Sequence, residues 1–149
     1  MRWQYNNPAA QYSDILENDS ITRAISIASG EDYKKIYELL NEYMKRENLD
    51  EKYIKNSWLK VRKDAAKELL KAMQYTWVPT MKFANGCKTR LRDGELPMGT
   101  LICNISKNLT CVVDGIIQDV YDPSRKMKLE DGTIKGTRAV YGYWFKETN

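Results

Sequence analysis

Three cysteines are the residues of this chain whose type alone is best suited to chemistry. Cys87, Cys103 and Cys111 lack C-x-x-C spacing, and the 149 residues include no histidine. Because protein zinc sites rely on clustered cysteine and histidine ligands, we expect no metal and no other cofactor. The chain does not begin with the apolar core of a signal peptide, which indicates reduced thiols in the cytoplasm. We interpret the cysteines as packing residues.

The charge of the chain is moderately basic, with 24 Lys and Arg against 20 Asp and Glu. Such a surplus can favour nucleic acid or another acidic partner. The lysines are interspersed with acidic residues, however, and no arginine-rich stripe accompanies them. This pattern is more typical of a solvated helical surface. No apolar run is long enough to span a membrane, so we expect no membrane partner.

Helical periodicity dominates the first half of the chain. Residues 18–20 (NDS) are typical capping residues before an apolar helical run, and Gly30 is a typical stop. Residues 29–32 (SGED) form an acidic variant of the capping box and predict the start of a second helix. A third helix is predicted over 63–74, and residues 48–62 are ambiguous, with only a short apolar face.

Strand patterns dominate the second half. Residues 101–105 and 109–113 are rich in aliphatic and β-branched side chains, and Asp114-Gly115 predicts a two-residue hairpin into a strand over 116–121. Asp131-Gly132 indicates a second turn, and 138–145 a last strand. The sequence therefore predicts an α+β fold, with N-terminal helices packed on a C-terminal antiparallel sheet.

Several segments, in one order over most of the chain, together resemble a known family. They are DSITRAISIASG (19–30), WVPTM (77–81) with Gly86-Cys87 and LPMGT (96–100), ISKNL (105–109), VDGIIQD (113–119) with DPSR (122–125), and RAVYGYW (138–144). The combination is similar to small phage and prophage proteins with a papain-like cysteine-peptidase fold, whose first motif is D-C-x-x-R-A-[IL]-x-I-A-[ST]-G. The resemblance implies one papain-like domain over residues 1–149.

The resemblance also assigns three site positions. Ser20 stands where relatives usually carry the nucleophilic cysteine, Asn108 stands where they usually carry the histidine base, and Asp119 matches the acidic residue that orients that histidine. A cysteine at a helix start would have a lowered pKa, whereas a serine hydroxyl stays protonated without a base. An asparagine amide cannot act as a general base. Two of the three catalytic groups are therefore replaced.

Each of these residues also has an ordinary structural interpretation. Ser20 can be a helix N-cap, and Asn108 can be a turn or strand-edge residue. Asp119 can pair with Arg125 or Arg138. The hypothesis of a former active site depends on all three positions matching the family pattern together.

Three functions follow as hypotheses. The first is a pseudoenzyme that binds, and by binding inhibits, a host or phage protein in the cytoplasm of an infected bacterium, for example a component of a CRISPR–Cas defence system. The second is an active cysteine or serine hydrolase with its nucleophile at Ser20. The third is a nucleic-acid-binding protein that uses the lysine surplus.

Overall fold

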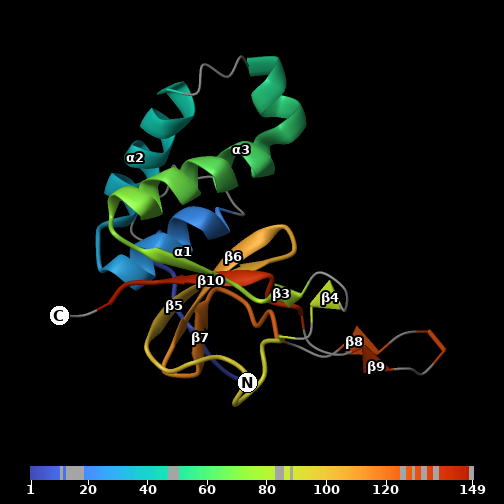
Figure 1. Ribbon diagram of the computed structural model, residues 1–149. Coiled ribbons are helices and arrows are strands. Elements are labelled where there is room, and N and C mark those ends of the chain that lie inside the picture. The colour runs from blue at the N-terminus through green and yellow to red at the C-terminus, as the bar shows by residue number, and fades with distance from the viewer. Residues whose placement is uncertain are drawn as a thin grey trace.

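The computed structural model shows an α+β fold in which helices cover one face of a mixed sheet (Figure 1). The structure describes residues 1–10, 12, 19–46, 51–82, 86–87, 89–124, 127–128, 130–131, 134–135 and 138–147, with only the backbone described for 46, 51–59, 82, 86–87, 127–128 and 134–135. Within these ranges the helices are α1 (Ser20–Ser29), α2 (Tyr33–Arg46) and α3 (Glu51–Ala72). No described helix is long and apolar enough to cross a membrane.

The main sheet contains strands from both ends of the chain. Its order is β1 (Arg2–Tyr5), β7 (Ile116–Asp119), β6 (Asn108–Val113), β5 (Thr100–Ile105), β10 (Gly142–Phe145) and β2 (Thr76–Pro79). Two short pairs lie outside it: β3 (Met81–Lys82) with β4 (Gly86–Cys87), and β8 (Met127–Lys128) with β9 (Ile134–Lys135).

The predicted purely antiparallel sheet is wrong in one respect. β1 pairs parallel with β7, with Arg2 opposite Ile116, while the other neighbours in the sheet are antiparallel. β1 was not predicted, although its four residues (RWQY) alternate polar and aromatic side chains, because a run of four residues is a weak strand signal. It also joins its partner from the far end of the chain, without an adjacent turn.

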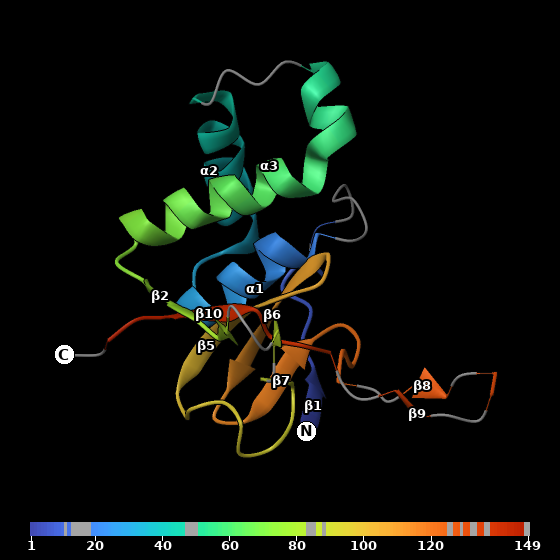
Figure 2. The ribbon, with the colours of Figure 1, turned by 45° about the vertical axis from the view of Figure 1, so that its right-hand side comes forward.

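Apolar side chains fill both faces of the sheet. Figure 2 shows α1 resting directly on the sheet, with α2 and α3 above it. The cluster on the helical face contains Ile21, Ala24, Ile25, Ile36, Leu40, Met44, Val61, Ala65, Ala66, Leu69, Leu70, Ile102, Leu109, Cys111 and Trp144. The cluster on the opposite face contains Leu91, Leu101, Cys103, Ile105, Val112, Ile117 and Val140. The alternation of Leu101 and Ile102 between the clusters follows from the two-residue period of a strand.

The helix predictions are largely confirmed, with corrected bounds for α2 and α3. α1 ends before Gly30, which adopts a left-handed conformation with φ of 75°. α2 starts at Tyr33, later than the capping box predicted. The Ser29 hydroxyl donates to the Ile25 carbonyl at 2.7 Å and accepts from Glu31 N at 3.2 Å, so it caps the connection that follows α1. At the start of α2, the Asp32 carboxylate accepts from Lys34 N at 3.2 Å. Residues 51–62 of the ambiguous stretch and the predicted third helix form a single helix, α3, which ends at Ala72 rather than at residue 74.

The strand predictions are confirmed for β5, β6 and the hairpin that follows. Asp114 and Gly115 have φ of 49° and 78°, as a type I′ turn requires. β7 ends at Asp119, and β10 is shorter than the predicted last strand because it begins at Gly142. Ala139 forms only a single bridge with Arg90. Of the second predicted turn, Asp131 is a turn residue, whereas Gly132, like Asn18 and Arg125, lies outside the described residues.

Candidate functional site

Ser20 is the first residue of α1, at the end of the helix that meets the start of β6. Its hydroxyl oxygen accepts a hydrogen bond from the backbone N–H of Leu109 at 3.3 Å. The residue is only 3% exposed. Asp19 occupies the N-cap position but makes no side-chain capping hydrogen bond. Ser20 therefore joins the helix start to the sheet, and the N-cap interpretation of Ser20 is wrong by one residue.

Asn108 is the first residue of β6, directly after the Ser106-Lys107 turn that joins it to β5. One orientation of its amide satisfies both polar atoms. In that orientation Nδ2 donates to Ser20 Oγ at 2.9 Å, and Oδ1 accepts from the Tyr121 hydroxyl at 3.2 Å and from Arg138 Nη1 at 3.3 Å. The two positions that the resemblance pairs as nucleophile and base are thus in direct contact.

Asp119 does not share this contact. Its carboxylate accepts from the Thr110 hydroxyl at 2.6 Å and from Val120 N at 2.7 Å, and it forms a buried ion pair with Arg23 at 3.7 Å. Burial raises the pKa of Asp119 despite these partners. Among the described residues, no hydrogen bond joins Asp119 to Asn108. Tyr121 and Arg138 hold the amide instead, so the predicted orienting role does not match the geometry.

The hydrogen-bond directions at Ser20 decide which chemistry the pair can perform. Both Leu109 N–H and the Asn108 amide point hydrogens at the serine oxygen. A general base must offer a lone pair at this point to take the hydroxyl proton, and an amide nitrogen has none available. Burial raises the pKa of Tyr121 as well, so the phenol behind Asn108 stays protonated. Neither Asn108 nor Tyr121 can activate Ser20 as a nucleophile at neutral pH.

A buried ionic network beside Ser20 was not predicted from the sequence. The Arg62 side chain, 3% exposed, donates to both oxygens of the Asp19 carboxylate and to the Thr22 hydroxyl at 2.8 Å. The Tyr33 hydroxyl donates to Asp19 at 2.9 Å, and burial together with this carboxylate raises the pKa of Tyr33. The network fixes the start of α1 against α2 and α3. The one feature of the sequence that indicated this network is a charged residue, Arg62, directly after Val61 on an otherwise apolar helical face.

Neither Cys103 nor Cys111 joins the described hydrogen bonds at Ser20. Cys103 and Cys111 are free, fully buried thiols, and burial raises the pKa of Cys111 to about 12 and the pKa of Cys103 still further. The prediction that they are packing residues is confirmed. The side chain of Cys87 lies outside the described part. Within the described ranges, no group of three histidine, cysteine, aspartate or glutamate side chains could hold a metal ion.

Comparison with known proteins assigns no function to this site: no protein-family model matches the chain, and neither does any curated protein or solved structure.

Proposed function

We propose that this chain is a papain-like pseudoenzyme that acts by binding a protein partner. The observation that carries the proposal is the 2.9 Å contact in which the Asn108 amide donates to Ser20 Oγ. In a thiol hydrolase, a histidine nitrogen in the same place would receive the proton of the nucleophile. Here the direction of the hydrogen bond is reversed, so the pair keeps its proximity and loses its reactivity.

The surroundings of Ser20 support a structural use of the old site. The residue is nearly inaccessible, which leaves little room for a substrate carbonyl beside the hydroxyl. Asn108 is held on its other side by Tyr121 and Arg138, and the start of α1 is held by Arg62. The site is thus a buried hydrogen-bond network, which favours rigidity over turnover.

The partner class follows from the resemblance to phage proteins. In that setting the partner is a host protein, with a component of antiviral defence such as a CRISPR–Cas system as one example. A shaped protein surface can serve binding without chemistry.

Ser20→Ala separates binding from catalysis. We expect the variant to retain the biological activity of the chain, measured as the amount of host protein that co-purifies with it from infected cells. Asn108→Ala serves as a second variant in the same pair. Complete loss of activity by a folded Ser20→Ala protein would contradict the proposal.

Active-site labelling tests the missing chemistry directly. A fluorophosphonate probe, which reacts with activated serines, should leave Ser20 unmodified in intact-mass analysis. Labelling of Ser20 by the fluorophosphonate would show an active serine hydrolase.

A further inference from the structure

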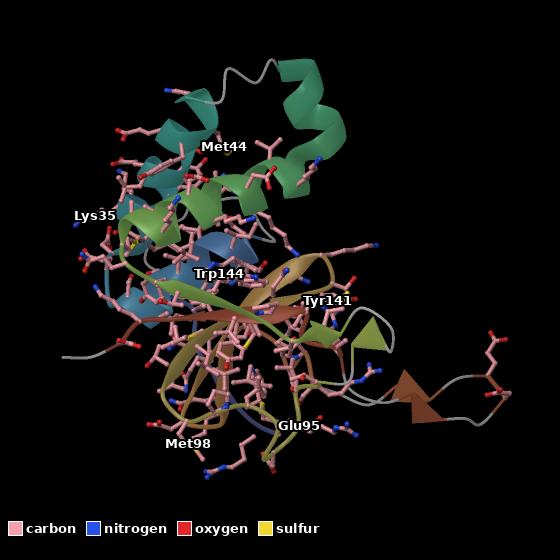
Figure 3. The ribbon with its side chains drawn as sticks, viewed as in Figure 1. Lys35, Met44, Glu95, Met98, Tyr141 and Trp144 are labelled. Atoms are coloured by element: carbon pink, nitrogen blue, oxygen red, sulfur yellow. The ribbon has the colours of Figure 1, made fainter. Side chains whose placement is uncertain are left out.

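A groove of about 440 Å³ lies between α3 and the sheet edge formed by β10 and β2. Lys60, Lys63 and Lys67 line it from the helix, and Trp77 lines it from β2. Spacings of three and four residues place these lysines on one helical face. Figure 3 shows Trp144, which also lines the groove, between α3 and the sheet, far from Met98 at the opposite end of the sheet.

Trp77 presents an aromatic surface to this groove, and its indole ring packs against two residues of β10. Its ring packs on the ring of Trp144 with centroids 4.4 Å apart. It also occupies the space over Gly142, where a Cβ would lie 2.2 Å from the indole. Trp144 is 6% exposed but Trp77 is 37% exposed. Trp77 is therefore a rigid platform with an open surface.

The charge of the groove is positive. Among the lining residues that the structure describes, three lysines outweigh one acidic residue, Asp64, by two charges. Lys63 is tied to the sheet, because its ammonium donates to Asn104 Oδ1 at 2.7 Å and to the Ile105 carbonyl at 3.0 Å. Lys60 and Lys67 are exposed, and neither forms an ion pair with an acidic side chain in the described part of the chain. Two cations are thus available to a ligand.

We propose that this groove binds single-stranded nucleic acid, with a base stacked on Trp77 and phosphates held by Lys60 and Lys67. An aromatic platform beside unneutralised lysines is the combination that single-stranded nucleic acids bind. Lys60 and Lys67 lie about 10 Å apart along the helix axis. One stacked nucleotide step is about 3.4 Å, so the two lysines contact phosphates that are more than one step apart. The site uses no residue of the Ser20–Asn108 pair and does not depend on the proposed function.

Fluorescence anisotropy with a labelled oligothymidine of about ten nucleotides tests the proposal. We expect binding at low salt that weakens about sevenfold between 50 and 200 mM salt, because two lysines, Lys60 and Lys67, contact phosphates. Trp77→Ala should weaken binding on the order of tenfold, because a stacked base is lost. Trp77→Phe, which keeps an aromatic face and checks that the fold is intact, should lose much less.

A matched pair of charge variants locates the site. Lys60→Gln with Lys67→Gln should reduce binding at least tenfold, whereas Lys34→Gln with Lys45→Gln removes the same charge from exposed positions of α2 and should change it little. Equal losses in the two double variants would overturn the proposal, because binding would then follow net charge alone. No binding at low salt would also overturn it. Polyglutamate that displaces the labelled oligothymidine as effectively as unlabelled oligothymidine does would also overturn the proposal, because the groove would then be a site for acidic peptide.

Discussion

The Arg62 guanidinium donates through one nitrogen to both carboxylate oxygens of Asp19, at 3.1 and 3.3 Å. This ion pair is almost entirely closed to solvent and links α3 to the residue directly before Ser20. A buried pair of this kind contributes little by comparison with apolar packing, but losing one partner leaves a buried charge uncompensated. The position of Ser20 therefore depends on a side chain 42 residues further along the chain.

Arg62→Met should destabilise the fold severely. The variant keeps most of the side-chain volume but removes the positive charge beside the buried Asp19 carboxylate, which keeps its hydrogen bond from Tyr33, at a cost of about 3–5 kcal/mol. Urea unfolding measures this loss. Arg92→Met removes an exposed arginine that pairs with Glu95 and should shift the transition far less. Equal shifts in the two variants would show that the buried pair has no special importance.

Gly142→Ala should disturb Trp77, because the new methyl group would meet the indole ring at 2.2 Å. We expect a loss of about 1–3 kcal/mol from overpacking and a change in tryptophan fluorescence. Combining it with Trp77→Ala removes the clash, so Gly142→Ala should cost much less in that background. An equal cost in both backgrounds would mean that Trp77 does not lie over Gly142.

Asp119 should make the stability of the fold depend on pH. Its pKa is raised above 3.8 by burial, so the folded state holds the proton more tightly than the unfolded chain. The stabilisation is fully present below 3.8 and is lost as pH rises through the folded-state pKa. Relative to Asp119→Asn, the free energy of unfolding should fall over that interval by at most about 1.4 kcal/mol per pH unit. A parallel pH dependence in the two proteins would contradict the assignment.

Thiol reactivity should follow burial. Cys103 and Cys111 are enclosed and resist ionisation, so a disulfide reagent should modify them only as fast as the fold opens. Native protein should therefore show no more than one rapidly reacting thiol. The Cys87→Ser variant should show none, and rapid modification in that variant would mean that one of the buried sites is accessible.

Local patterns predicted the fold well where the responsible residues are neighbours in sequence. The hairpin at Asp114-Gly115 and the helix ending at Gly30 depend on backbone conformations that a few adjacent residues set, and both are confirmed. β1 was missed because its place in the sheet comes from pairing with β7, more than a hundred residues away.

The candidate site was likewise predicted only in part. The resemblance placed Ser20 and Asn108 at paired positions, and they are in contact. It did not indicate that Tyr121 and Arg138 would take the place predicted for Asp119, because hydrogen-bond partners depend on side-chain geometry at the end of the strand. The groove was equally invisible in the sequence, since Lys67 and Trp77 face each other only after β2 pairs with β10.

The place of β10 inside the sheet also sets the order in which the molecule can be completed during synthesis. β10 lies between β5 and β2, so β2 has no strand beside it in the main sheet until residues 142–145 leave the ribosome. Until then Trp77 lacks both Gly142 and Trp144 beneath it. The helices and the β5–β6–β7 meander can form earlier, whereas the lysine-lined groove forms only once residues 142–145 can pair with β2.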